Sequence, residues 1–212
     1  ILAFAYETAT GAKVPADLVE DREGKYFHRE TGEELRQIVA KMSKSLKNVV
    51  NPDDVVKLYG ADSLRLYEMF MGPLDVIKPW TDTGVKGVFG FLGRVTRFFG
   101  EAENVNAAEE DMEVLKGLHQ TIKKVSLDIE ALKFNTAISQ MMIFTNLCIK
   151  KGKVTKQTAE AFACVLAPFA PHLAEELWAF YGNKPSISRH DFPVANETYL
   201  QEDTFDYPVS FN

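Results

Sequence analysis

The sequence has few cysteines, few histidines and no long apolar run, and each shortage excludes a class of protein. Only two of the 212 residues are cysteine and four are histidine, and none shows metal-ligand spacing, so we predict no metal site. Cys148 and Cys164 lie in separate apolar helical patterns, which favours reduced core thiols in a cytoplasmic protein over a disulfide. No apolar stretch is long enough to span a membrane. The opening residues ILAFAY lack the basic start and cleavage site of a secretory signal.

The composition is that of a soluble globular protein with enough apolar residues to form a core. Hydrophobic residues make up 46% and charged residues 25% of the 212, which allows more than one structural unit. The chain starts within an apolar pattern without an initiator Met, and it stops in an extended-looking run, DYPVSFN. We therefore expect it to be a segment of a longer protein.

Positive charge is concentrated in two segments of an otherwise acidic chain. The net charge is −6, yet residues 41–100 carry 9 Lys and Arg against 6 Asp and Glu, and residues 121–153 carry 6 against 2. Such local asymmetry is what binding to a polyanion requires. Ordinary solvated helix faces would give the same counts, so charge alone leaves both interpretations open.

Turn signals and helix caps divide the first 75 residues into two kinds of structure. Short runs separated by turn residues predict a small β-rich unit over residues 1–40. After it, Asn51 is suited to the N-cap of a short helix, and Gly60 is placed to end that helix. Asp62 is predicted to cap a second short helix that runs to Met71, where a Gly-Pro pair stops it.

Longer helical patterns follow and predict a bundle. In the clearest, over residues 109–132, apolar residues recur at spacings of three and four: Met112, Leu115, Leu118, Ile122, Val125, Ile129 and Leu132. Similar patterns cover residues 82–99, 134–150 and 155–180, and two prolines, Pro168 and Pro171, should break the last into two helices. Short loops join these helices, so neighbours should pack antiparallel. The predicted fold class is mainly α, an antiparallel helical bundle preceded by the β-rich unit and a lysine-rich loop.

That loop contains the string KMSKS, from Lys41 to Ser45. Its two ammonium groups can point at one target and neutralise a chain of phosphates, while the Ser43 and Ser45 hydroxyls and the loop amides can bind phosphate oxygens. This suits a nucleoside triphosphate, because cations that tighten as pyrophosphate leaves ATP lower the barrier. The alternative interpretation is a basic loop that is solvated and binds no nucleotide.

The string also resembles, letter for letter, the second nucleotide-binding motif of class I aminoacyl-tRNA synthetases. In that family the loop holds ATP while the aminoacyl adenylate forms. The resemblance implies ATP as a substrate, accompanied by Mg²⁺ in the full enzyme. It also implies that Lys41 and Lys44 are catalytic, with Met42, Ser43 and Ser45 beside them in the ATP site. No cofactor is expected to bind this chain alone.

The resemblance covers nearly the whole chain. The run NPDDVVKLYGADSLRLYEMFMGP is similar to the segment that follows this loop in the synthetases for leucine, isoleucine and valine. The run from Pro79 to Val95, and the later runs FNTAISQMM and LAPFAPHLAEELW, look most like the leucyl-tRNA synthetase family. Residues 1–40 resemble the leucine-specific insertion that bacterial-type members carry just before the loop, which favours leucine over its two relatives.

By this resemblance the chain has four parts. They are the insertion at 1–40, the KMSKS loop and end of the catalytic domain at 41–75, a tRNA-binding helical bundle at 76–195, and the start of a linker or strand to a further domain at 196–212. The family's first nucleotide motif, leucine pocket, editing domain and zinc-bearing segment lie upstream of the matched region, so we expect the chain to be inactive alone. A fragment of an isoleucyl or valyl enzyme, or a stand-alone helical RNA-binding module, are the alternatives.

The partners implied by the resemblance are tRNA(Leu) and, in the full-length enzyme, ATP and leucine. We expect a monomer that does not bind a membrane. This family generally recognises leucine tRNA without reading its anticodon, so we expect contacts to the RNA backbone. Plain solvation is the alternative for each of the basic candidates, which are Lys86, Arg94, Arg97, Lys123, Lys124, Lys150, Lys151 and Lys153. Trp80 is expected to be a packing anchor, and His172 to lie in the first turn of its helix.

Overall fold

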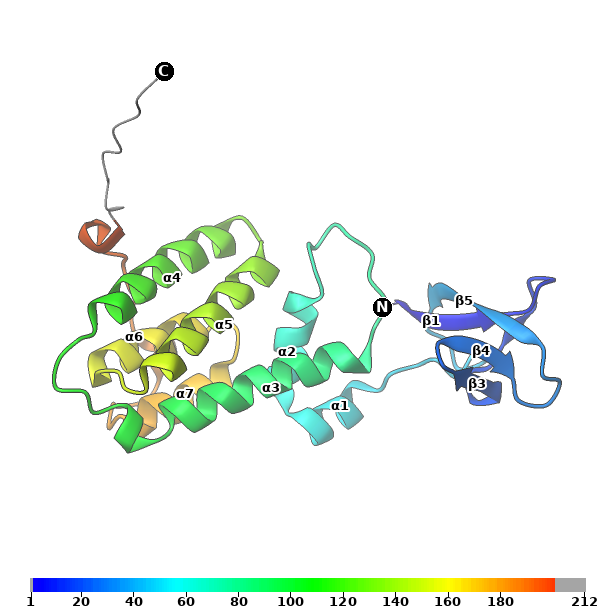
Figure 1. The fold of residues 1–212 in the computed structure, drawn as a ribbon, viewed down its shortest axis with the longest axis horizontal. Coiled ribbons are helices and arrows are strands. Elements are labelled where there is room, and N and C mark those ends of the chain that lie inside the picture. Colours follow the sequence, from blue (N-terminus) through cyan, green and yellow to red (C-terminus); the bar gives the residue numbers. More distant parts are fainter. Residues whose placement is uncertain (1, 201–212) are drawn as a thin grey trace, which may run out of the picture. The chain divides into compact units, whose positions relative to one another are not determined.

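A small antiparallel sheet forms from the segments between the predicted turns. The structure is a computed structural model that describes residues 2–200 (Figure 1). The sheet has the strand order β2-β1-β5-β4-β3, with η1 at Ala16–Leu18. The strands are β1 Leu2–Glu7, β2 Lys13–Val14, β3 Val19–Arg22, β4 Lys25–His28 and β5 Glu34–Lys41. The β-rich prediction is thereby confirmed over residues 2–40.

The central strand pair of this sheet is β1 with β5. Its register runs from Leu2 opposite Lys41 to Glu7 opposite Arg36. Glu7 is only 9% exposed, and its carboxylate accepts two hydrogen bonds from the Arg36 guanidinium. This buried charge is therefore paired, as a low-dielectric position requires. The ladder ends at Lys41, so the KMSKS string begins where the chain leaves the sheet.

Two short helices follow the sheet, α1 at Pro52–Tyr59 and α2 at Ala61–Phe70. The predicted N-cap is confirmed, because the Asn51 side chain accepts from the Asp53 amide at 3.1 Å. Gly60 ends α1 and also precedes α2, with φ +86° and ψ 158°, a conformation open to glycine. The prediction that Asp62 caps α2 is wrong. Gly60 is the N-cap and starts the helix two residues earlier, which places Asp62 in its first turn, 8% exposed.

Trp80 packs where it was expected to, just before α3 at Asp82–Phe99. Its ring is 7% exposed and meets Tyr67 edge-on, with 4.7 Å between ring centroids. Its Nε1–H donates to Asp82 Oδ1 at 2.9 Å, and its backbone N–H donates to the carbonyl of Leu2 at 2.9 Å. The indole is therefore satisfied within this part of the chain and is a packing residue.

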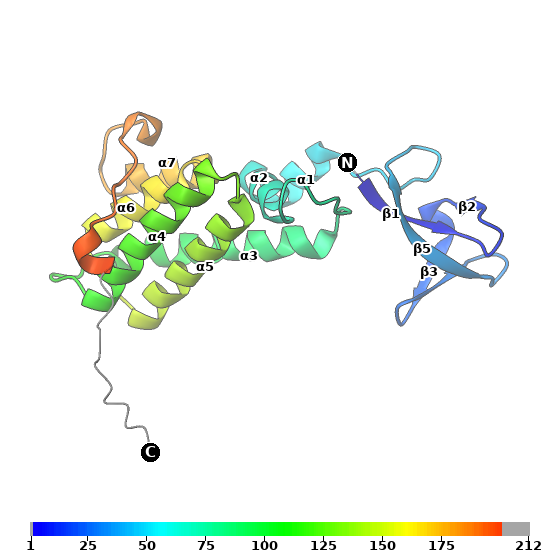
Figure 2. The same cartoon turned by 90° about the horizontal axis from the view of Figure 1, so that it is seen from above.

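The rest of the described chain is helical. Its elements are η2 Ala102–Asn104, α4 Met112–Glu130, α5 Phe134–Lys151, α6 Lys156–Leu166, α7 Pro171–Phe180, η3 Ile187–Arg189 and η4 Glu197–Leu200. Figures 1 and 2 show α4, α5, α6 and α7 side by side. The predicted break at Pro168 and Pro171 is confirmed, and His172 lies in the first turn of α7. Asp111, whose carboxylate accepts from the amides of residues 113 and 114, starts α4 slightly later than predicted.

The described residues divide into two compact units. The first contains residues 2–93 and 132–135, and the second contains residues 94–131 and those from 136 onward. In the second unit, three fully buried rings form the centre of the core. Phe162 lies 4.8 Å from Phe99 and 5.2 Å from Phe144, measured between centroids. The Tyr181 hydroxyl donates to the carbonyl of Phe99 at 2.9 Å, which satisfies a carbonyl at the end of α3.

The apolar stripe of α4 is buried only in its middle. Leu118, Ile122 and Val125 are at most 4% exposed, whereas Met112 and Leu132 are 64% and 57% exposed. The apolar stripe that the spacing predicts is therefore not part of the core at either end. Leu132 lies beyond the helix with φ +55°. Periodicity describes the face of an isolated helix, and burial also needs a neighbouring element at that height.

Both cysteines are buried free thiols, as predicted. Burial raises the pKa of Cys148 to about 12 and that of Cys164 to about 11, so both stay protonated near neutral pH. Across residues 2–200, no helix combines the length and apolarity that crossing a bilayer demands.

A C-terminal strap, residues 193–200, lies against α4. The Asn196 amide donates to Nδ1 of His119 at 3.1 Å, and the Tyr199 ring stacks on the His119 ring at 4.9 Å with 8° between the planes. Lys123 reaches both carboxylate oxygens of Glu197 at 3.0 Å. His119 is therefore the central contact of the strap.

This contact should depend on pH. Burial lowers the pKa of His119 from its usual 6.5, and Nδ1 must be unprotonated to accept the Asn196 N–H. Because the folded-state pKa lies below the unfolded value, the unfolded chain binds more protons at this residue. Its contribution to stability is therefore complete above about pH 6.5 and is lost as the pH falls from there towards the folded-state pKa. Lys123 of α4 and Glu197 of the strap form an ion pair between the same two elements.

We expect acidification from about pH 7.5 to about pH 5.5 to reduce the free energy of unfolding less in His119→Asn than in the unchanged chain. Asparagine keeps an acceptor near the Nδ1 position but does not titrate. The matched control His172→Asn alters an exposed histidine on α7 and should retain the full effect. Denaturant unfolding at both pH values measures it, and identical pH dependence with and without His119 would contradict this assignment.

Candidate functional site

The KMSKS string begins at the last residue of β5 and continues into a loop that reaches α1. Residues 42–51 contain no helix or strand. Lys41, Lys44 and Ser45 are exposed, while Met42 and Ser43 are half-buried. Lys41 and Lys44, the two lysines predicted to be catalytic, are therefore exposed to solvent between β5 and α1.

Hydrogen bonds inside the loop give it a defined shape. The Ser43 amide donates to Oδ1 of Asn48 at 2.9 Å, and the Ser43 hydroxyl lies 3.1 Å from that of Ser45. The Leu46 amide donates to the Ser43 hydroxyl at 3.2 Å. The Lys47 amide donates to the carbonyl of Lys44 at 3.2 Å. The Ser43 amide is thus engaged within the protein, so it is less available to a phosphate than the sequence alone suggests.

The second half of the loop is attached to the β unit. The Ala16 amide donates to the carbonyl of Leu46 at 2.9 Å. The Lys47 ammonium lies 2.5 Å from Oδ2 of Asp17, and this hydrogen bond lowers the pKa of the Asp17 carboxyl. Among the described residues, neither Lys41 nor Lys44 has such an ion pair. Lys47 is therefore paired with a carboxylate of the β unit, while Lys41 and Lys44 are exposed.

Asn48 is the loop residue that the sequence did not single out. It is 9% exposed. Its Nδ2 donates to the carbonyl of Phe4 in β1 at 3.3 Å, across a sequence separation of 44 residues. A polar residue after a lysine-rich turn carries no local signal of such a distant bond, so only the tertiary structure reveals it.

Three of the eight basic candidates for RNA contact are paired with carboxylates of this chain. Lys124 lies 2.5 Å from both oxygens of Asp128, which is only 4% exposed and also accepts from the Thr136 hydroxyl at 2.6 Å. Lys151 lies 3.0 Å from Asp111 and 2.6 Å from a second carboxylate, that of Glu113. Lys123 pairs with Glu197 in the strap. The Lys151 pairs and the Thr136 bond join α5 to α4 or its N-cap, the Lys123 pair joins α4 to the strap, and the Lys124 pair lies within α4.

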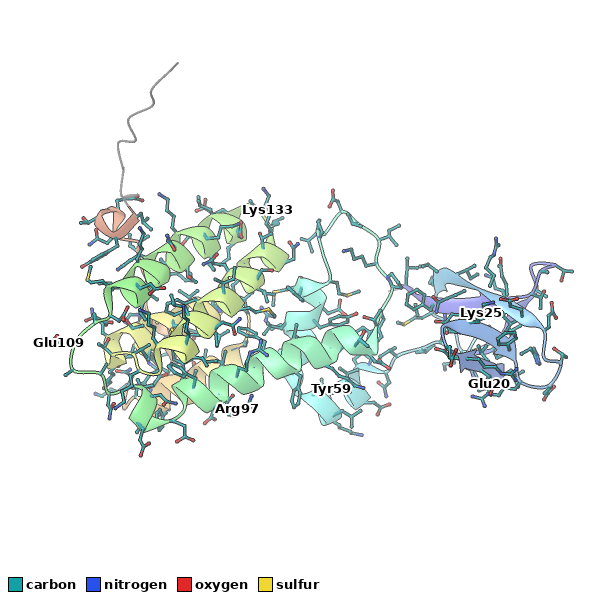
Figure 3. All side chains as sticks on the ribbon, in the orientation of Figure 1. Glu20, Lys25, Tyr59, Arg97, Glu109 and Lys133 are labelled. Carbon is teal, nitrogen blue, oxygen red and sulfur yellow. The ribbon has the colours of Figure 1, made fainter. Side chains whose placement is uncertain are left out.

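The other five basic candidates have no ion pair among the described residues. Lys86, Arg97, Lys150 and Lys153 are exposed, and Figure 3 shows the place of Arg97 on α3. Arg94 is half-buried, and its Nε is buried without a hydrogen-bond partner in the part of the chain that the structure describes. Positive charge that a polyanion could meet thus lies on α3, at the end of α5 and just after it.

Comparison with known proteins identifies both regions. Residues 37–74, which contain the loop, match the family model of class I tRNA synthetases (I, L, M and V). Residues 111–211 match the anticodon-binding domain of tRNA ligases. The leucine–tRNA ligases of Borrelia turicatae (strain 91E135) and Borrelia duttonii (strain Ly) are 49% and 44% identical to this chain over 90% and 100% of its length. The chain belongs to the leucine–tRNA ligase family.

Members of the leucine–tRNA ligase family are much longer than this chain, which spans 22% and 25% of the two Borrelia proteins. A solved structure agrees: the chain resembles the Agrobacterium radiobacter K84 agnB2 LeuRS in its ternary complex with tRNA and LeuAMS. The TM-score is 0.67 and the identity 34%, over 76% of this chain and 23% of that one. The predicted relationship to leucine–tRNA ligases is confirmed, and it is favoured over the isoleucyl, valyl and stand-alone alternatives.

Proposed function

We propose that this chain supplies the ATP-phosphate-binding loop and a tRNA-contacting helical domain to a leucine–tRNA ligase. Such an enzyme activates leucine with ATP to form leucyl adenylate and pyrophosphate, and then transfers the leucyl group to tRNA(Leu). The observation that carries the proposal is the intact KMSKS loop within a class I match, with Lys41 and Lys44 exposed and Lys47 held by Asp17.

In the first step, a leucine carboxylate oxygen attacks the α-phosphorus of ATP, and the bond from that phosphorus to the bridging oxygen breaks. Negative charge then accumulates on the departing pyrophosphate. The Lys41 and Lys44 ammonium groups are proposed to follow the β- and γ-phosphates and to stabilise that charge more strongly in the transition state than in bound ATP. Met42, Ser43 and Ser45 complete the proposed ATP-binding stretch. Mg²⁺ is expected with ATP in the full enzyme, and no residue of this chain is assigned to it.

The helical part is proposed to contact tRNA(Leu) through its backbone. The match to an anticodon-binding domain and the similarity to a LeuRS in complex with tRNA support this. Three of the basic candidates are weaker because a carboxylate of this chain already neutralises them, namely Lys123, Lys124 and Lys151. The stronger candidates are Lys86, Arg94, Arg97, Lys150 and Lys153. In this proposal residues 1–40 are the leucine-specific insertion, 41–75 are the KMSKS loop and the end of the catalytic domain, and 76–195 form an antiparallel bundle. Residues 196–212 start a linker or strand to a further domain, and 201–212 lie outside the residues that the structure describes.

Replacing Lys44 tests the loop. In the full-length ligase, Lys44→Ala should slow leucine-dependent pyrophosphate exchange by roughly a hundredfold to a thousandfold, about 3 to 4 kcal/mol, mostly in kcat. The matched control is Lys25→Ala, which removes an exposed lysine from β4 of the same unit and should leave the rate unchanged. An effect of Lys44→Ala confined to leucine binding would refute the assigned role.

Charge reversal tests the RNA surface. Lys150→Glu with Lys153→Glu, and separately Arg97→Glu, should weaken tRNA binding about tenfold and make its salt dependence shallower by about one unit of slope for each phosphate that the variant no longer neutralises. Arg94 is left intact because its Nε is buried. Lys156→Glu is the control, since Lys156 already faces Glu160 at 3.7 Å. The rate of adenylate formation should not change. If the affinity for tRNA and its salt slope are also unchanged, these side chains are only solvated and do not contact RNA.

The 212-residue chain by itself is expected to make no leucyl adenylate, because its loop lysines have no leucine and no second half of an ATP site to act upon. It should retain weak tRNA affinity that disappears with salt. Pyrophosphate exchange, beside tRNA titration at low and moderate salt, measures both. Leucine-dependent exchange in a clean preparation would mean that these residues hold a complete active site.

A further inference from the structure

The Asn48 side chain contacts both the KMSKS string and the sheet. Its Oδ1 accepts from the Ser43 amide at 2.9 Å, and its Nδ2 donates to the Phe4 carbonyl at 3.3 Å. The residue is 9% exposed. It is therefore placed to hold the loop, and it is not placed to touch a ligand in solvent.

The other two attachments of the loop depend less on side-chain identity. The bond from Ala16 to Leu46 joins backbone atoms, so most substitutions at either position preserve it. The ion pair between Lys47 and Asp17 is exposed, with side chains 59% and 47% accessible, and such pairs contribute little in water. Asn48 is the attachment that a conservative substitution can remove.

The chemistry of Asn48 matches its two partners. A carboxamide has one oxygen that accepts and one NH₂ that donates. An aspartate there could still accept from the Ser43 amide, but it would turn a second oxygen towards the Phe4 carbonyl with nothing to donate. A buried acceptor facing another acceptor is costly. Asn48→Asp therefore removes the bond to the sheet while keeping the shape of the side chain.

These bonds close a ring around the start of the string. Phe4 pairs with Val39 in the ladder between β1 and β5, two residues before Lys41. The ring returns through Asn48 to Ser43, and the same Ser43–Asn48 bond closes the adjoining turn from Lys44 to Lys47. The backbone of Lys44 is thus held relative to Lys41, while the Lys44 side chain remains exposed.

We propose that Asn48 is a positioning residue for adenylate formation, which holds the KMSKS loop against β1 so that Lys44 meets the departing pyrophosphate. Asn48 touches neither substrate and acts through Ser43 and the backbone of Lys44. This inference rests on the proposed function of the loop. Preorganised charge accelerates a reaction because it does not have to be arranged at the moment of reaction, and a misplacement of about 1 Å can cost about a hundredfold.

The experiment measures leucine-dependent pyrophosphate exchange in the full-length ligase for Asn48→Asp, Lys44→Ala and the double variant. Asn48→Asp should lower kcat by roughly tenfold to a hundredfold, with KM for leucine unchanged. In the Lys44→Ala background the same change should have little further effect, because the group it positions is gone. The control is Asn51→Asp, the same chemical change at an exposed helix N-cap, which aspartate also suits.

The outcomes distinguish failure of the positioning role of Asn48 from failure of the proposed function of the loop. If Lys44→Ala slows exchange while Asn48→Asp does not, the positioning role fails and the function of the loop stands. If the two effects multiply in the double variant, Asn48 is a stability residue and the inference is overturned. If Lys44→Ala leaves kcat unchanged, the proposed function of the loop fails, and this inference fails with it. Thermal unfolding of each variant, with Asn48→Ser as a smaller substitution, covers the case in which Asn48→Asp does not fold.

Discussion

The antiparallel ladder between β1 and β5 determines where the KMSKS loop begins and where it returns. Leu2 pairs with Lys41 and Phe4 with Val39, so the chain leaves the sheet at the first lysine of the string. Asn48 then bonds back to Phe4. A slip of one residue in this ladder would turn every side chain of the strand to the other face. It would also move the start of the loop relative to the carbonyl that anchors its end. The ion pair of the buried Glu7 with Arg36 adds a second constraint on this register.

Carboxylates of this chain neutralise some of its basic side chains and leave others exposed. Asp17 engages Lys47 in the loop, and Asp128 engages Lys124 on α4. Such pairs at the surface contribute little to stability. They matter more to a polyanionic ligand, because the attraction depends on the summed local charge. The acidic net charge of the chain is thus compatible with local positive sites at Lys44 and at the C-terminal end of α5.

Most of the secondary structure could be predicted from the sequence because its signals are local. The Asn51 cap and the break at Pro168 and Pro171 depend on a few neighbouring residues. The errors have a common cause. Met112 continues the α4 periodicity but is exposed, and Asp62 looks like a cap but is preceded by a glycine that starts the helix earlier. The burial of Met112 depends on which element packs beside it, and the start of α2 depends on a competing residue, Gly60. The periodicity of the sequence contains neither kind of information.

The family resemblance could be recognised from the sequence alone, because KMSKS and the runs around it are contiguous and need no coordinates. The sequence also determined where the helices lie and that both thiols belong to the core. The ion pair of Lys47 could not be predicted in this way, since its partner Asp17 lies 30 residues away in η1, and Lys44 has no ion pair among residues 2–200. The bond of Asn48 to a carbonyl on β1 likewise appears only in the folded chain. Ion pairs and hydrogen bonds act over a few ångströms, and only the folded backbone brings such distant residues within that range.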